Sequence, residues 1–357
     1  MEDKTSVNYF HIAFEDYNIQ RLVQILQREQ FKNKTIVLSS VREMYNWSEI
    51  VSNIFPLIDD TLRQFNIQSW IFVVNKTFNV DKHKIPKNIQ VVAVDYFALD
   101  INYQRDYNNI KFNNNWNSKS SKALLLMGKT GKRNRLPLLY KFVNSGLIEH
   151  LEYSFLPFYN HNLDVNSEEE FKLLSGDEYS NFAQKYARSP DDIVDPLIHT
   201  TEHITSGYPF DVNLYRSTVL SIVPESEVGQ SEKIWLTEKT WKTIANCHPF
   251  IIVGQHGTLQ YLKTLGFRTF EQYLLHQDYD FDLDINSQLN KVVENTEYFL
   301  QNFKKHRKEI LQDTKHNLNT LEQLIKSNII KHEMFQNKHF LFTFLDNTNI
   351  SNQLACS

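Results

Sequence analysis

Apolar residues in the first hundred positions fall into short runs separated by segments with helical spacing. Four runs are rich in β-branched and aromatic residues, and the later ones lack polar alternation, which is typical of strands buried on both faces of a parallel sheet. The predicted strands are 7–14, 35–40, 69–75 and 89–95, and the predicted helices between them are 18–30 and 48–66. This alternation predicts a doubly wound, Rossmann-like α/β domain.

A second alternation of strand and helix follows a polar segment. Residues 103–122 are rich in Asn and Ser and lack periodicity, which predicts an interdomain linker or a long loop. Beyond it, strands are predicted at 123–128, 217–226 and 249–254, helices at 135–146, 237–247 and 257–267, and long amphipathic helices from 285 to 327. We therefore expect an α/β protein with two Rossmann-like domains, 1–118 and 119–284, that face a cleft, and a helical tail over 285–357.

Composition narrows the class of protein. The chain has 357 residues, of which 41% are hydrophobic and 22% charged, and this balance is typical of a globular protein. The net charge of −4 argues against a protein whose main task is to coat nucleic acid. Two cysteines are too few for a disulfide framework, and we find neither a signal peptide nor an apolar run long enough to span a bilayer. We therefore expect a cytoplasmic protein without a membrane span.

Gly128-Lys129-Thr130 is similar to the end of a nucleotide-binding P-loop. Such a loop needs a glycine five positions before the glycine of its GK[ST] end, so that bare backbone N–H groups wrap the phosphates. Ala123 stands at that position, and residues 124–127 are Leu and Met. The motif therefore does not predict an NTPase, and the basic residues Lys129, Lys132, Arg133 and Arg135 need another explanation.

The most informative stretch is 220–270. A predicted strand ends at Glu225-Ser226, and a loop leads to Thr237-Glu238-Lys239, which opens a helix. Glu238 and Lys239 would lie beside the positive end of the helix dipole. There the carboxylate can accept hydrogen bonds from ribose hydroxyls, and the ammonium can neutralise phosphate. The alternative interpretation is a capping box with a solvated lysine.

The arrangement of the whole stretch resembles the donor-binding half of α-1,3-fucosyltransferases and related glycosyltransferases of the two-Rossmann (GT-B) fold. It is also similar to glycosyltransferase-like proteins of phages and large DNA viruses. The matching residues are Glu225-Ser226, Thr237-Glu238-Lys239, Ile244-Ala245 and the strand from Pro249 to Gly254. The Asn that the family has between Glu and Ser is absent, and the loop to Thr237 is longer. The likeness covers roughly residues 120–275 and does not extend to the first domain.

The resemblance implies a nucleotide-sugar site. Arg135 matches the arginine that contacts donor phosphates from the first helix of the second domain, Glu238 would bind ribose, and Lys239 would hold the diphosphate with Arg135. Tyr215 could pack on a base or a sugar, or belong to the core. The full set of predicted donor-binding residues is Gly128, Lys129, Lys132, Arg135, Tyr215, Glu225, Ser226, Thr237, Glu238 and Lys239.

The implied activity is transfer of a sugar from a nucleotide-sugar to a hydroxyl of a glycan, a small molecule or a modified DNA base. The resemblance implies no metal and no further cofactor, with Arg135 and Lys239 assisting departure of the nucleotide. Glu15 and Asp16 follow the first predicted strand, and Asp95 ends the fourth. These three are the candidate bases, although each could also be an ordinary turn or N-cap residue. A catalytically silent nucleotide-sugar or glycan-binding module is the alternative.

The acidic segment 278–284 places four Asp at alternate positions. A divalent-metal site is one interpretation, but a calcium loop would need Gly where Leu283 stands. Carboxylate runs are usually solvated, so we expect an exposed acidic loop or edge strand.

Overall fold

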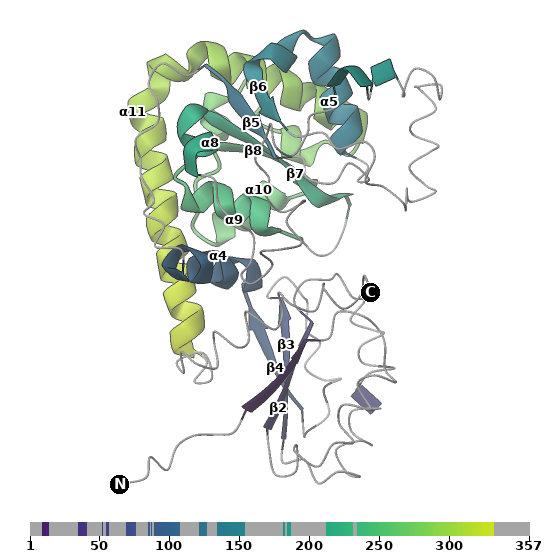
Figure 1. Ribbon diagram of the computed structural model, residues 1–357, viewed down its shortest axis with the longest axis vertical. Helices are drawn as coiled ribbons and strands as arrows, with labels where there is room; N and C mark the ends of the chain where they lie inside the picture. Colours follow the sequence, from purple (N-terminus) through teal and green to yellow (C-terminus); the bar gives the residue numbers. More distant parts are fainter. Residues whose placement is uncertain are drawn as a thin grey trace. The chain divides into compact units, whose positions relative to one another are not determined.

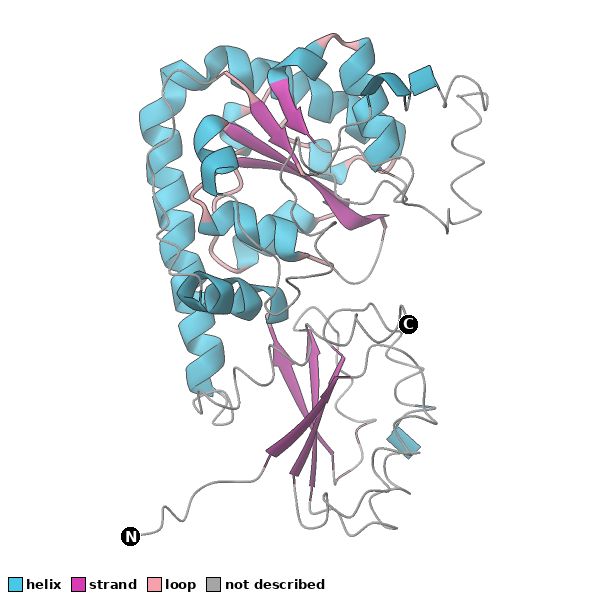
Figure 2. Ribbon diagram, viewed as in Figure 1, coloured by secondary structure: helices cyan, strands magenta, loops and turns pink. Residues whose placement is uncertain are grey.

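The computed structural model describes part of the chain. The described residues are 9–13, 35–40, 52, 55–56, 69–75, 85, 87, 89–107, 121–126, 134–153, 181–182, 184–186, 212–230 and 234–331. The chain divides into two compact units, of which unit 1 comprises Met1–Tyr103, Ile204–Gly207 and Ile325–Ser357, and unit 2 comprises Gln104–His203 and Tyr208–Leu324. Each unit contains a parallel sheet, so the protein belongs to the mixed α/β class and has a helical C-terminal region (Figures 1 and 2).

The sheet of unit 1 confirms the four predicted strands. They are β1 (Tyr9–Ala13), β2 (Thr35–Ser40), β3 (Ser69–Asn75) and β4 (Ile89–Val94), all parallel. Ile36, Val37 and Phe72 are buried, as expected of a sheet covered on both faces. The spatial order β1-β2-β3-β4 follows the chain. Among the described strands it therefore lacks the reversal that a doubly wound sheet requires.

A helix that the sequence pattern did not predict follows this sheet. α4 (Tyr96–Tyr107) begins directly after Asp95 and buries Tyr96, Phe97 and Leu99. Its second half is polar, so the helical period fades there, and the predicted linker is wrong over 103–107. Predicted helix 18–30 lies outside the described residues, as does all of 48–66 except positions 52, 55 and 56.

The sheet of unit 2 reverses its strand order. Its parallel strands are β5 (Ala123–Leu125), β6 (Leu151–Tyr153), β7 (Leu220–Gly229) and β8 (Phe250–Gln255), arranged β6-β5-β7-β8. β5, β7 and β8 confirm predicted strands, whereas β6 was missed because three residues carry too little periodicity. The chain leaves β5 for β6 on one side and later returns to β7 on the other. A topological switch point therefore lies between the carboxyl ends of β5 and β7.

Short helices flank this second sheet (Figure 1). They are α5 (Arg135–Asn144), η4 (Leu147–His150), α8 (Val212–Ser217), α9 (Glu238–Ala245), α10 (Thr258–Thr264), η6 (Glu271–Tyr273) and η7 (Tyr279–Phe281). α5, α9 and α10 confirm predicted helices. Gly146 ends the α5 region with φ +76°, in the left-handed conformation that glycine adopts without steric penalty.

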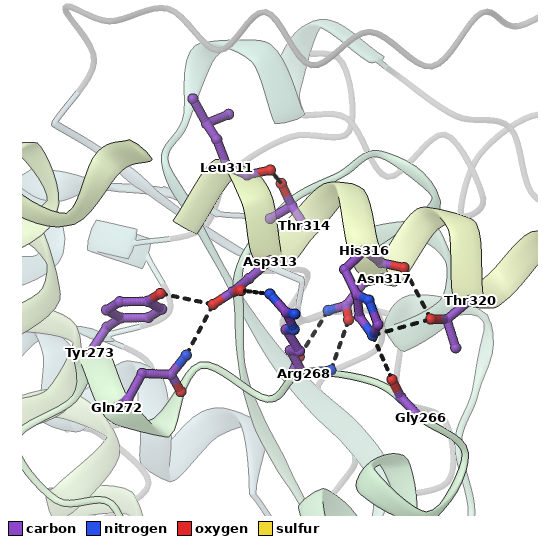
Figure 3. Close-up of polar contacts among 10 residues, drawn as sticks. All are labelled: Gly266, Arg268, Gln272, Tyr273, Leu311, Asp313, Thr314, His316, Asn317 and Thr320. Carbon is purple, nitrogen blue, oxygen red and sulfur yellow. Dashed lines mark hydrogen bonds and ion pairs between the residues drawn. The ribbon is translucent and has the colours of Figure 1, made fainter. Parts of the chain in front are cut away.

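A long helix, α11 (Ile285–Lys331), follows as one continuous element. Polar contacts fasten it to the loop after α10 (Figure 3). Asp313 accepts hydrogen bonds from Arg268, from Gln272 at 3.0 Å and from Tyr273 at 2.8 Å. The Asn317 amide bonds both the backbone N–H and the carbonyl of Arg268, each at 2.8 Å. This set of contacts, which we call the α11 latch, fixes the course of residues 268–273.

Two carboxylates of the acidic segment 278–284 cap the starts of helices. Asp280 is fully buried and accepts from the Leu259 N–H at 3.0 Å, at the start of α10. Burial raises the pKa of Asp280 to about 7. Asp284 accepts from the N–H groups of Asn286 and Ser287 at the start of α11. The prediction of an exposed loop is therefore wrong for Asp280, because a carboxylate also serves to cap a helix.

Candidate functional site

The switch point of the second sheet brings two helix starts together. α5 follows β5 and α9 follows β7, so both helices begin at the carboxyl edge of this sheet. In open α/β sheets, ligands bind at this edge and beside the reversal of strand order. Helix starts also present backbone N–H groups and the positive end of the helix dipole. We therefore build the site from the residues at these two helix starts.

Asn134 joins the start of α5 to two neighbouring strands, β7 and β8. Its side-chain N–H₂ group donates to the carbonyl of Glu225 at 3.0 Å and to that of Val253 at 3.3 Å. The side chain is fully buried, and its Oδ1 has no partner among the described residues. Asn134 thereby fixes the start of α5, where Arg135 is the next residue, beside β7 and β8.

Glu225 holds the start of α9 against the second half of β7, a strand that runs to Gly229 and so beyond its predicted end at Ser226. Its fully buried carboxylate accepts from the Thr237 N–H at 3.0 Å, the Thr237 hydroxyl at 2.5 Å and the Thr240 hydroxyl at 2.6 Å. Burial raises the pKa of Glu225, against the opposing effects of Lys239 and the two threonine hydroxyls. Because three hydrogen bonds already occupy this carboxylate, Glu225 positions α9, and Thr237 serves as its N-cap.

Glu238 and Lys239 form an ion pair at the first turn of α9. The Lys239 ammonium lies 2.6 Å from Oε1 of Glu238, and the two residues are 9% and 7% exposed. Lys242, one turn further, is also buried. Burial opposes ionisation of Glu238, but Lys239 and Lys242 together outweigh it and lower the pKa of this carboxyl to about 2. Glu238 is therefore ionised at neutral pH, and the interpretation as a solvated lysine is wrong.

Arg135 is the first residue of α5 and is 3% exposed. A cation at a helix start opposes the helix dipole, and burial removes the water that would screen it. Arg135, Lys239 and Lys242 are thus buried cations on the two helices that begin at this edge, and among the described residues the buried carboxylates Glu225 and Glu238 lie at the start of α9. Anions bind favourably at helix starts.

The loop before α9 is tied to the end of β8. Gln255, the last residue of β8, accepts from the Trp235 N–H at 2.6 Å through its side-chain Oε1. Gly254 precedes it, and a Cβ there would lie 2.9 Å from the Thr258 hydroxyl. The Gly at the end of the strand that matched the glycosyltransferase pattern is thus required for close packing of α10 behind β8.

Tyr215 lies at the opposite, amino edge of this sheet. Its buried ring meets His248 edge-on, with 5.6 Å between centroids. His248 accepts or donates at Nδ1 with the Ser221 hydroxyl at 2.7 Å and bonds the Thr218 carbonyl at 3.0 Å through Nε2. A carbonyl only accepts, so Nε2 carries the proton and Nδ1 accepts from Ser221. Burial lowers the pKa of His248 to about 4. The structure therefore places Tyr215 in the core and not with the other predicted donor-binding residues.

The remaining predicted residues divide into two groups. Ser226 is half-buried near the end of β7, beside Glu225. Asp95 is buried in unit 1, directly before α4, where its carbonyl accepts from the Leu99 N–H at 3.0 Å. The residues that lie outside the described part of the chain are Glu15, Asp16, Gly128, Lys129 and Lys132.

Sequence reasoning missed Asn134, Lys242 and Gln255. Asn134 lies between two arginines that attracted attention by their charge, and its value depends on carbonyls about a hundred residues away. Lys242 was found only as part of a helix, although it is one turn from Glu238. Gln255 could have been found from the sequence, because it is a polar residue at the end of an apolar strand.

Comparison with known proteins adds no family assignment: no protein-family model and no curated protein matches this chain. Among the described residues, no group of three or more His, Cys, Asp and Glu side chains is placed to hold a metal ion. No helix in the described ranges combines the length and the apolar character needed to cross a bilayer.

Proposed function

We propose that the protein is a glycosyltransferase of the GT-B type that transfers a sugar from a nucleotide-sugar to a hydroxyl acceptor. The observation that carries the proposal is the buried cluster of Glu238, Lys239 and Lys242 at the start of α9, beside the switch point of a Rossmann-like sheet. Ligands of such sheets bind at this place. The resemblance of residues 220–270 to donor-binding halves of glycosyltransferases supports the same interpretation.

The cluster has the chemistry that a sugar diphosphate requires. An ammonium has three N–H donors, and the one hydrogen bond found for the Lys239 ammonium among the described residues goes to Glu238. The other donors can bind phosphate oxygens, while Glu238 retains lone pairs for ribose hydroxyls. Lys239 and Arg135 would stabilise the negative charge that develops on the departing nucleoside diphosphate. With these cations the reaction would need no metal ion.

A catalytic base completes the proposal. Inverting transfer needs a group that takes the proton of the acceptor hydroxyl. Glu15, Asp16 and Asp95 are the candidates that the sequence provides. The acceptor would be a glycan, a small molecule or a modified base in DNA, and DNA binding would show a steep dependence on salt concentration because phosphate contacts release counterions.

The site assignment is tested by calorimetric titration with uridine and guanosine diphosphates. We expect Lys239→Ala and Arg135→Ala each to weaken binding of the preferred nucleotide at least tenfold, because a charge-assisted hydrogen bond contributes about 1.5–3 kcal/mol. Lys141→Ala is the matched control, since Lys141 lies on α5 and bonds Asn290 at an exposed position. Unchanged affinity in both site variants would show that the site lies elsewhere.

A second measurement separates an enzyme from a catalytically silent binding module. Glycosyltransferases commonly hydrolyse their donor slowly when no acceptor is present, so we expect slow release of nucleoside diphosphate from the bound nucleotide-sugar. A protein that binds the donor without any release, with or without a panel of acceptors, would be the silent module.

A further inference from the structure

A groove of about 630 Å³ lies beside α10. The residues that line it come later in the sequence than those of the proposed donor site. Its wall runs from Lys263 on α10, through Arg268 and Glu271, to Phe281 on η7. The Phe281 ring meets that of His256 edge-on at 5.3 Å, and His256 directly follows β8. The Phe281 end of the groove is therefore next to the residue that follows β8.

The α11 latch holds the polar wall of the groove in place (Figure 3). Arg268 and Gln272 both donate to Asp313, and Asn317 clamps the Arg268 backbone. Asp313 and Asn317 are themselves buried. Side chains fixed in this way lose little conformational entropy when a ligand binds, so the groove is preorganised.

The charges of the groove are balanced by internal partners. Lys263 lies 2.8 Å from Glu271, and Arg268 pairs with Asp313. Asp278, at the far end, lies 3.6 Å from Lys291 of α11. Lys291 lies closer still, at 3.1 Å, to Asp282. Because each of these cations already has a carboxylate, the described part of the groove offers no unpaired cation to a phosphate or sulfate. It suits a neutral ligand that makes many hydrogen bonds.

An aromatic face completes this chemistry. Phe281 is 48% exposed, so its ring is accessible to a ligand at this wall of the groove. Gln277 and Asp278, also exposed, lie in the same wall. An exposed ring can pack on the C–H face of a pyranose, while planar amides and carboxylates pair with neighbouring hydroxyls.

We propose that this groove binds a neutral oligosaccharide. The inference does not rest on the proposed sugar transfer, since a groove can hold a glycan whether or not the donor site is active. If the protein does transfer sugars, the groove would hold part of an acceptor chain on the same unit as the donor site.

The test is a titration of the full-length chain with three neutral hexasaccharides, namely maltohexaose, cellohexaose and N-acetylated chitohexaose, followed by saturation-transfer NMR. A heparin hexasaccharide serves as the anionic comparison. We expect at least one neutral sugar to bind more tightly than heparin. Phe281→Ala should weaken that binding about tenfold, which corresponds to about 1.4 kcal/mol, and Gln277→Ala should weaken it by a smaller factor.

Leu283→Ala is the matched control, because Leu283 is 65% exposed and two residues from Phe281 but does not line the groove. Lys239→Ala separates the groove from the donor site. Both variants should retain the wild-type affinity for the hexasaccharide. The proposal is overturned if no neutral sugar binds at millimolar concentration, if heparin binds best, or if Phe281→Ala has no effect. It is equally overturned if Lys239→Ala abolishes sugar binding, whereas loss of nucleotide binding alone would refute only the donor-site assignment.

Discussion

At the amino edge of the second sheet, Ser221, His248 and the Thr218 carbonyl form a chain of neutral hydrogen bonds. At the carboxyl edge of the same sheet, Glu238 and Lys239 are buried as charges with Lys242 one turn away. The first set uses both ring nitrogens of its histidine on protein partners and stays uncharged. In the second set, the Lys239 ammonium makes one hydrogen bond among the described residues, to Glu238, and so keeps donors for a further partner. Buried polar groups of the first kind stabilise a fold, whereas those of the second kind indicate a ligand.

The largest expected effect on stability concerns the Glu225 carboxylate, which joins α9 to β7 at the carboxyl edge. Glu225→Ala would leave the N–H of Thr237 and two threonine hydroxyls without their acceptor in a fully buried place. We expect the free energy of unfolding to fall by about 3–5 kcal/mol, since each unsatisfied buried donor is costly. Urea denaturation followed by circular dichroism measures this change.

Glu227→Ala is the control for Glu225→Ala, because Glu227 is two residues further along β7 and only half-buried. It should change the free energy of unfolding by less than about 1 kcal/mol. If both variants have the same small effect, Glu225 does not hold α9 in place. The distinction between Glu225 as a positioning acid and Glu238 as a ligand-binding acid would then be wrong.

The second prediction concerns the amino edge and its dependence on pH. The folded pKa of His248 is about 4, below the ordinary value of about 6.5 for an unfolded chain. The unfolded chain therefore binds this proton more readily than the folded protein. Stability from the neutral ring is fully present above about pH 6.5 and is lost as the pH falls towards about 4, by about 3 kcal/mol in total.

Denaturant titrations at a series of pH values measure this loss. Subtraction of the same series for His248→Leu removes the contribution of all other titrating groups. A difference curve that stays flat between about pH 7 and about pH 4 would mean that His248 is not buried as a neutral ring. The amino edge would then not consist of neutral groups, and its contrast with the charged carboxyl edge would be wrong.

The sequence predicted the strands better than the helices and the geometry of the site. β2 and β3 were found with their observed bounds, because β-branched residues in short apolar runs leave little alternative. β6 and α4 were missed, since one is too short and the other turns polar halfway. Local pattern also predicted α9 and the position of Glu238 and Lys239 in its first turn.

The contacts that build the candidate site could not be predicted in this way. Asn134 reaches carbonyls of β7 and β8 only because the strand order reverses between β5 and β7. Tyr215 and Glu225 are only ten positions apart in sequence, but Tyr215 lies on α8 before β7 begins, whereas Glu225 lies in the second half of that strand. Sequence spacing records which residues neighbour one another along an element, and strand order decides which elements become neighbours.

The smallest effect concerns packing at the carboxyl edge. Gly254→Ala would place a Cβ 2.9 Å from the Thr258 hydroxyl, which is itself fixed by a hydrogen bond of 2.5 Å to the Gln255 carbonyl. We expect a loss of about 1–3 kcal/mol in the free energy of unfolding, as for other overpacked cores. Thr258→Ala removes the obstructing hydroxyl, so the double variant should be destabilised by less than the sum of the single variants, with a coupling of at least about 0.5 kcal/mol. Strict additivity of the two changes would show that α10 can move away from β8, and that the carboxyl edge is less tightly built than the neutral edge opposite it.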